Sequence, residues 1–248
     1  MAITETALKN HEELFPNHKS TLKDTDPELI EVFDNFAFDE VLRYGNLDTG
    51  TRLMVILGSM IASQALGEYK VMLGGALNVG ITPIEVKEIV YQAVPYVGIA
   101  KVFDFIHATN DILRSRGITL PLEDQSTTTP ETRFEKGLAL QKEIFGDLID
   151  TMYREAPPNQ HHIQEYLSAN CFGDYVTRTG LDIKKRELLT FSMLLSLGGC
   201  EPQLKGHIQG NLNVGNDKEI LLSVVNQLIP YVGYPRALNA IRCINEVV

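Results

Sequence analysis

The sequence has little of several features that define common protein classes. It holds three cysteines and no tryptophan in 248 residues. An odd number of cysteines, all between residues 171 and 243, does not form a disulfide framework, so we expect reduced thiols and a cytoplasmic location. No uninterrupted apolar run reaches the roughly 18 residues of a membrane span. The N-terminus lacks the basic and apolar regions of a secretory signal.

Basic residues are also scarce. There are 22 of them against 32 acidic residues, which gives a net charge of -10. This excess argues against nucleic acid or an anionic membrane surface as a partner. The sequence shows no P-loop, no glycine-rich dinucleotide motif and no paired zinc ligands, so we expect neither a nucleotide nor a metal cofactor. A small-molecule substrate is the expected partner.

What the sequence has is the same helical unit twice. Three short motifs recur after 134 or 135 residues: Leu47-Asp48 with Arg52 as Leu181-Asp182 with Arg186, Asn78-Val79-Gly80 as Asn213-Val214-Gly215, and Pro95-Tyr96-Val97-Gly98 as Pro230-Tyr231-Val232-Gly233. Repetition over such a distance indicates two domains of similar topology.

The apolar pattern predicts helices through most of the chain. Residues 52–65 and 186–198 are apolar nearly all round, which is typical of helices buried on every side. Thr82-Pro83 is a helix start, and the glycines of the repeated Asn-Val-Gly motif fit helix C-terminal caps. The repeated Pro-Tyr-Val-Gly motif predicts a chain break before the last helix of each copy. No period-two alternation is sustained, so the fold class is all-α.

The repeat predicts two tandem helical domains, at 26–119 and 133–248. A linker rich in Pro, Asp, Ser and Thr joins them at 120–132. Residues 1–25 form a polar N-terminal extension, the one stretch whose composition is typical of disorder. Helices that are apolar all round have more surface to bury than one small domain covers, so we also expect self-association.

Only the second copy carries polar chemistry at three matched places. It has Glu187, Cys200 and His207, where the first copy has Leu53, a position near Leu66, and Met72. A fold that tolerates Leu and Met there does not need Glu and His. Each residue alone has an ordinary explanation, as a first-turn acid, a core thiol and a solvated imidazole. Together they favour a functional site, because clustered titratable groups mark such sites.

The spacing of these residues predicts one cleft. Cys200 precedes Glu201-Pro202, a helix start, and a thiol at a helix N-terminus has a lowered pKa. Cys200, Gln203 and His207 are three and four residues apart and share one helix face. Antiparallel packing on the preceding helix would bring Glu187 towards His207. We therefore predict Glu187, Cys200 and His207 as catalytic residues that relay a proton, with Gln203 as substrate-binding.

At this point the second copy resembles the carboxymuconolactone decarboxylase family, which includes the alkylhydroperoxidase D-like proteins. The likeness lies in Arg186-Glu187-Leu188-Leu189-Thr190, in His207, in Asn213-Val214-Gly215, and in the stretch from Tyr231 to Ala240. The first copy is similar to a diverged member. The resemblance implies an all-helical fold with two tandem domains, and a homotrimer equivalent to a six-domain ring.

The family's peroxidase-like branch uses a Glu, a Cys-x-x-Cys and a His. Glu187, Cys200 and His207 match that pattern, whereas Gln203 stands in place of the second cysteine. The decarboxylase branch removes CO2 from a lactone acid without a cofactor, and is matched at the Glu and His positions. Either activity is implied by the resemblance.

Two enzymatic hypotheses and one non-enzymatic hypothesis follow. In a peroxidase-like enzyme, Cys200 attacks a peroxide while His207 and Glu187 manage protons, and Cys171 or an external thiol resolves the product. In a lyase acting on a lactone acid such as 4-carboxymuconolactone, His207 protonates the carbon left by CO2 loss, and Cys200 only lines the pocket. The third is a helical assembly protein without activity. Decarboxylation calls for no thiol, so Cys200 favours the peroxidase.

Overall fold

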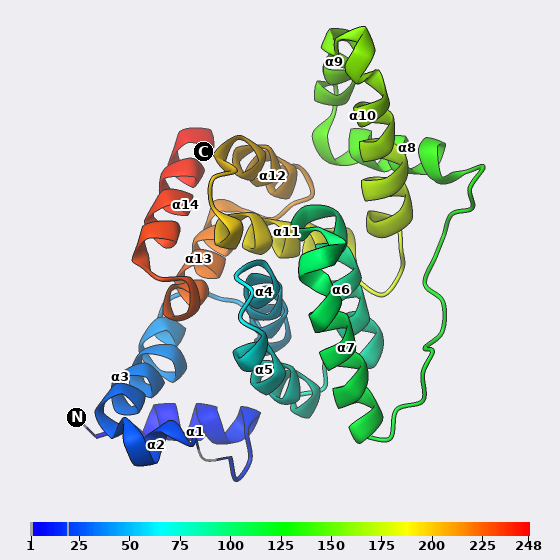
Figure 1. The fold of residues 1–248 in the computed structure, drawn as a ribbon. Coiled ribbons are helices and arrows are strands. Elements are labelled where there is room, and N and C mark those ends of the chain that lie inside the picture. Colours follow the sequence, from blue (N-terminus) through cyan, green and yellow to red (C-terminus); the bar gives the residue numbers. More distant parts are fainter. Residues whose placement is uncertain (1, 19) are drawn as a thin grey trace.

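The computed structural model describes residues 2–18 and 20–248 (Figure 1), and among them it contains helices and no strand. The all-α prediction is confirmed. The first half contains α1 (Glu5–Leu14), α2 (Leu22–Thr25), α3 (Pro27–Phe38), the short η1 (Glu40–Arg43), α4 (Thr49–Ala62), α5 (Leu66–Asn78), α6 (Pro83–Val97) and α7 (Ile99–Ser115). The second half contains α8 (Arg133–Phe145), α9 (Leu148–Glu155), the short η2 (Pro158–Gln160), α10 (His161–Tyr166), the π-helical η3 (Leu167–Val176), α11 (Ile183–Leu197), α12 (Glu201–Asn213), α13 (Lys218–Val232) and α14 (Tyr234–Val247). In the described part of the chain, no helix combines the length and apolar character that a membrane crossing needs.

Helices α4 to α7 repeat as α11 to α14, and α4 and α11 pack against each other at the centre (Figure 1). Gly58 permits this contact, because a Cβ atom there would lie 2.5 Å from Cδ1 of Leu189. The Ser196 hydroxyl also donates to Oγ of Ser59 at 2.7 Å. One helix of each repeat also bridges this pair: α6 packs on α11 as well as on α4, and α13 packs on α4 as well as on α11. Each repeat therefore completes the core of the other.

Matched capping residues start the central helices. The Asp48 side chain accepts a hydrogen bond from the Thr51 N–H, and the Asp182 side chain accepts one from the Lys185 N–H, each at 2.9 Å. This satisfies backbone donors that a helix N-terminus leaves free. The repeated Leu-Asp motif is thus a helix start in both copies.

The predicted chain breaks fall later than the prolines. Pro95 lies inside α6 and Pro230 inside α13, so the predicted break before the last helix of each copy is confirmed, but the final glycine of the motif makes it and not the proline. The chain turns at Gly98 and Gly233 instead, whose φ angles of 90° and 77° glycine adopts without steric cost. The tyrosine after each proline consequently stands on the last turn of a helix.

Part of the N-terminal stretch is helical, contrary to its composition. Residues 5–14 form α1, capped by Thr4, and bury Ala7 and Leu14. This helix occupies the place that α8 has in the second repeat. Asn78 donates to the Leu14 carbonyl at 2.8 Å, just as Asn213 donates to that of Ile144 at 2.8 Å. A helix that closes part of the core cannot be disordered, so that expectation is corrected.

The segment between α7 and α8 contains the predicted linker, 120–132. It runs as extended chain along one side of the molecule (Figure 1). It is tied to the second repeat where the Thr179 N–H donates to the Gln125 carbonyl at 3.0 Å.

Candidate active site

A carboxylate and an imidazole of the second repeat form a buried pair. Nδ1 of His207 on α12 lies 2.9 Å from Oε2 of Glu187 on α11. The Glu187 side chain is 1% exposed and that of His207 is 12% exposed. An ionised carboxylate only accepts hydrogen bonds, so Nδ1 carries the proton in this contact. Nε2 is left as the nitrogen that can exchange a proton with a substrate.

A buried asparagine fixes the spacing of the two helices that carry this pair. The Asn211 amide donates to the Glu187 carbonyl at 3.1 Å and to the His207 carbonyl at 2.7 Å. Its own oxygen accepts a hydrogen bond from Asn216 at 2.9 Å. Because Asn211 is fully buried and bonded on both sides, it holds α11 and α12 in one register.

Two aromatic rings enclose the imidazole. Phe145 at the end of α8 meets His207 edge-on, with ring centroids 5.3 Å apart, and Tyr96 does so at 5.7 Å. Gly210 leaves the room that this packing needs, since a Cβ atom there would come within 2.8 Å of both Phe145 and Oε2 of Glu187. The site therefore draws on α8, α11 and α12 of the second repeat and on α6 of the first.

The hydroxyl of Tyr96 is a further polar group beside the Glu187–His207 pair. It is buried and makes no hydrogen bond of normal geometry within the described residues. Burial, with the nearby Cys171 thiol and the Glu187 carboxylate, raises the pKa of Tyr96 well above its usual value. Burial likewise raises the pKa of Cys171 to about 12. Both groups are neutral at physiological pH.

Arg186 is held away from this chemistry, although it directly precedes Glu187. Its guanidinium donates to Glu88 at 2.9 Å and to Gln92 at 2.8 Å. It also donates to the carbonyls of Arg178 and Thr179. A guanidinium engaged in this way is unavailable to a substrate. Arg186 therefore forms a structural ion pair, and its partner Glu88 comes from the first repeat.

Cys200 occupies the predicted helix N-terminus without the predicted activation. It is the N-cap residue of α12, but its thiol points back and donates to the Leu194 carbonyl at 3.3 Å. Burial raises the pKa of Cys200, and the Glu201 carboxylate adds to this, against a partial opposing effect of Arg236. The expected lowering of the pKa is therefore wrong in direction.

Cys200 and His207 also lie among different neighbouring residues. The charged and thiol groups that act on Cys200 include Arg236 and Cys243 of α14, whereas His207 contacts Glu187, Tyr96 and Phe145. No interaction found among the described residues joins Cys200 to the Glu187–His207 pair. Gln203 is exposed, and its substrate-binding role stays a prediction.

Sequence reasoning missed three contributors for different reasons. Tyr96 recurs as Tyr231, and this recurrence hid its role because the packing of α6 on the central helices of both repeats leaves no local sequence signal. Phe145 lies outside the stretch in which the repeat is visible. Asn211 could have been found, since the first repeat has Ala76 at the matched position, 135 residues earlier.

Comparisons with known proteins agree with this architecture. The model described as the carboxymuconolactone decarboxylase family matches residues 27–111 and 162–246. The chain is 27% identical to 4-carboxymuconolactone decarboxylase from Acinetobacter baylyi over 118 residues, which cover 47% of this chain and 87% of the relative. It is 28% identical to nitrosuccinic acid decarboxylase from Metarhizium robertsii over 121 residues, 46% of this chain and 83% of the relative. Each relative is thus matched by a length typical of one repeat.

Proposed function

Because the chain belongs to the carboxymuconolactone decarboxylase family, as a tandem two-domain member, we propose that it is a carboxy-lyase that removes CO2 from a small carboxylic acid without a cofactor. The observation that carries this proposal is the buried Glu187–His207 pair, present in one repeat and replaced by Leu53 and Met72 in the other. The names of both relatives denote loss of CO2 from an acid. This proposal reverses the preference for a peroxidase, which rested on the presence of Cys200, a thiol that decarboxylation does not need.

The reaction needs a general acid that protonates one carbon atom of the substrate. When the carbon–carbon bond to the carboxylate breaks, CO2 leaves and the electron pair stays on carbon, delocalised into a neighbouring electron-withdrawing group. Nε2 of protonated His207 gives its proton to that carbon, and water later returns a proton to the imidazole. Glu187 accepts the Nδ1–H hydrogen bond, which orients the ring and leaves Nε2 for the substrate. The substrate class is therefore an acid whose carbanion is stabilised by an adjacent acceptor.

Tyr96 acts in this proposal as a positioning residue. Its ring packs on His207 and its neutral hydroxyl lies close enough to Glu187 for the two to interact electrostatically. A neutral hydroxyl beside a buried carboxylate helps to hold the charged group without adding a competing charge. The active site would then be shared between the two repeats.

A direct test measures CO2 release from 4-carboxymuconolactone and from nitrosuccinate. We expect release with the wild-type protein, and a fall of about 10²–10⁴-fold in kcat for His207→Asn. His107→Asn is the control, because that imidazole is exposed on α7 and should leave kcat unchanged. Hydroperoxide turnover that depends on Cys200, with no CO2 release from either acid, would overturn the proposal.

We also propose that the chain forms a homotrimer. Exposed apolar side chains occupy matched places in both repeats: Leu29 and Val32 match Ile163 and Tyr166, and Ile99 and Phe103 match Tyr234 and Leu238. Repeated exposed apolar positions support an assembly that uses equivalent faces of the two repeats. Light scattering should give three times 27.7 kDa, and a mass of 27.7 kDa would contradict it.

Val32→Glu should dissociate this assembly if the matched face is buried in it. Leu148→Glu is the control, since Leu148 is similarly exposed but the residue 134 positions earlier is the buried Leu14. Dissociation by both variants would show that the matched face has no special role.

A further inference from the structure

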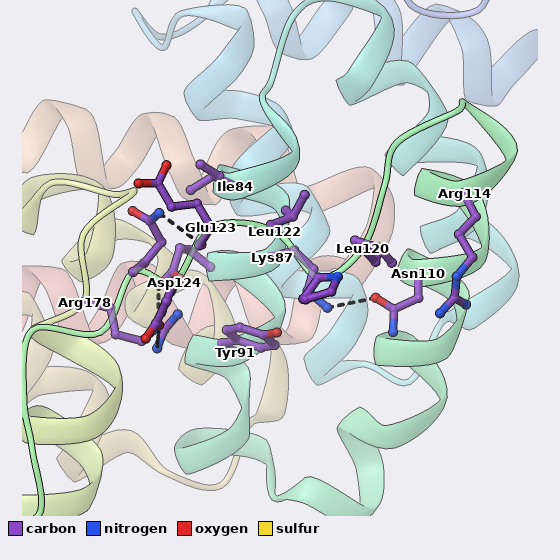
Figure 2. Close-up of a pocket in the computed structure, with 13 residues that line it drawn as sticks. Ile84, Lys87, Tyr91, Asn110, Arg114, Leu120, Leu122, Glu123, Asp124 and Arg178 are labelled. Atoms are coloured by element: carbon purple, nitrogen blue, oxygen red, sulfur yellow. Dashed lines mark hydrogen bonds and ion pairs between the residues drawn. The ribbon is translucent and has the colours of Figure 1, made fainter.

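A cavity of about 630 Å³ lies outside the Glu187–His207 site (Figure 2). Helices α6 and α7 form its floor, and residues 120–125 of the connecting segment run along its edge. Its volume falls in the range of small-molecule sites. The side chains that line it carry charge at two ends and apolar surface between them.

Lys87 supplies a buried cation without an anionic partner. Its residue is 9% exposed, and none of the described carboxylates pairs with it. Nζ donates to Oδ1 of Asn110 at 2.8 Å and lies 4.8 Å from the centre of the Tyr91 ring (Figure 2). An amide oxygen and an aromatic face only partly compensate a buried ammonium, which has three donors.

The other charges of the cavity are already balanced or solvated. Glu88 accepts from Arg178 at 3.0 Å and from Arg186 at 2.9 Å. Glu123 and Asp124 are exposed at the edge. Arg114 lies at the Lys87 end, with only an exposed partner, Asp111, at 3.5 Å. A ligand with one negative charge at the Lys87 end would therefore balance the charges of the cavity. A second negative charge at the opposite end of the ligand would lie near Glu123 and Asp124.

The second repeat shows that the fold does not require this lysine. The position matched to Lys87 is Leu222, and that matched to Tyr91 is Asn226. Asn226 instead donates to the Val41 and Tyr44 carbonyls at 2.7 Å, which closes that face with the chain itself. The cation and the aromatic ring are thus particular to the first repeat, where the face stays open.

We propose that this cavity binds a small organic monocarboxylate with a flat apolar body. The carboxylate accepts from Nζ of Lys87 and from the Asn110 amide N–H group, for which the described residues show no acceptor, while the amide oxygen accepts from Lys87. The body lies against Tyr91, with Leu120 and Leu122 as aliphatic walls. This site is independent of the proposed decarboxylation.

The test uses 4-fluorobenzoate as the probe and its 19F line width as the readout of binding. Every protein compared carries His207→Asn, which removes the imidazole of the proposed active site. Probe binding therefore cannot depend on that imidazole. We expect saturable binding, weakened about tenfold or more by Lys87→Met, because a charge-assisted hydrogen bond is lost. Lys101→Met is the control, since Lys101 is exposed on α7 and should leave binding unchanged.

A second variant separates a specific loss of binding from a folding defect caused by Lys87→Met. Asn110→Asp gives the ammonium a carboxylate of its own and should abolish probe binding while the thermal unfolding midpoint is kept or raised. Binding that survives both variants, or that is absent from the His207→Asn protein, would overturn the proposal. Displacement of the probe by inorganic phosphate as readily as by benzoate would show a general anion site and overturn the organic carboxylate assignment.

Discussion

The ring of Tyr96 meets the imidazole of His207 edge-on at 5.7 Å, although the two residues belong to different repeats. Tyr96 stands on the last turn of α6, and α6 packs on α11 of the second repeat. Because α6 packs on the central helices of both repeats, it places a first-repeat side chain at the second-repeat site. The matched Tyr231 reaches the first repeat, where it approaches Arg52 instead of an imidazole.

Tyr96→Phe tests whether this contact serves catalysis. We expect kcat for CO2 release to fall by up to about tenfold with little change in KM, because the neutral hydroxyl that interacts electrostatically with Glu187 is lost. The pH profile of kcat/KM should also shift, which a purely structural role would not cause. Tyr231→Phe is the matched control, and equal effects of both variants on kcat would contradict a role particular to Tyr96.

Cys200 should behave as an unactivated thiol. Its pKa is raised from 9.0, so the reactive thiolate is below about 1% of the thiol at pH 7 and increases about tenfold with each unit up to pH 8. Iodoacetamide labelling followed by peptide mass spectrometry would measure this rate between pH 6 and 9. A rate that levels off below pH 7 would instead indicate a depressed pKa and return the peroxidase hypothesis.

The same thiol should be dispensable for decarboxylation. Cys200→Ser replaces a group whose one hydrogen bond goes to the Leu194 carbonyl, and we expect CO2 release to stay within about twofold of wild type. A loss as large as that of His207→Asn would place Cys200 in the reaction.

Gly210 and Gly75 offer a matched pair, because a phenylalanine packs on each. A Cβ atom at Gly75 would lie 2.6 Å from Phe15, and one at Gly210 would lie 2.8 Å from Phe145 and from Glu187. Alanine at either place overpacks the core at a cost of about 1–3 kcal/mol, offset in part by about 1 kcal/mol of helix propensity. Both variants should unfold at lower temperature than wild type.

Only Gly210→Ala should lower kcat, by about 10²-fold, because it displaces the carboxylate that orients His207. Thermal unfolding and CO2 release, measured on the same preparations, separate the two effects. An equal fall in kcat for Gly75→Ala would mean that general loosening, and not displacement of Glu187, limits the reaction.

The sequence predicted what depends on local pattern. Helices, caps and the repeat follow from spacing, and the approach of Glu187 to His207 follows from antiparallel packing of two consecutive helices. What it could not predict depends on contacts between distant segments. The direction of the Cys200 thiol is set by the Leu194 carbonyl and by burial, which oppose the favourable field of a helix N-terminus. The ordering of α1 likewise comes from packing on the first-repeat core, which its polar composition does not reveal.

The junction of the two repeats should be the most costly place to remove a charge. Glu88 is 1% exposed and pairs with Arg186, which is also 1% exposed. Glu88→Gln leaves that guanidinium buried without a carboxylate, and we expect a loss of about 3 kcal/mol or more in the free energy of unfolding. Asp111→Asn, which removes an exposed ion pair with Arg114, should cost less than about 1 kcal/mol. Urea unfolding at pH 7 would measure both, and equal losses would show that the buried carboxylate contributes no more than a surface one.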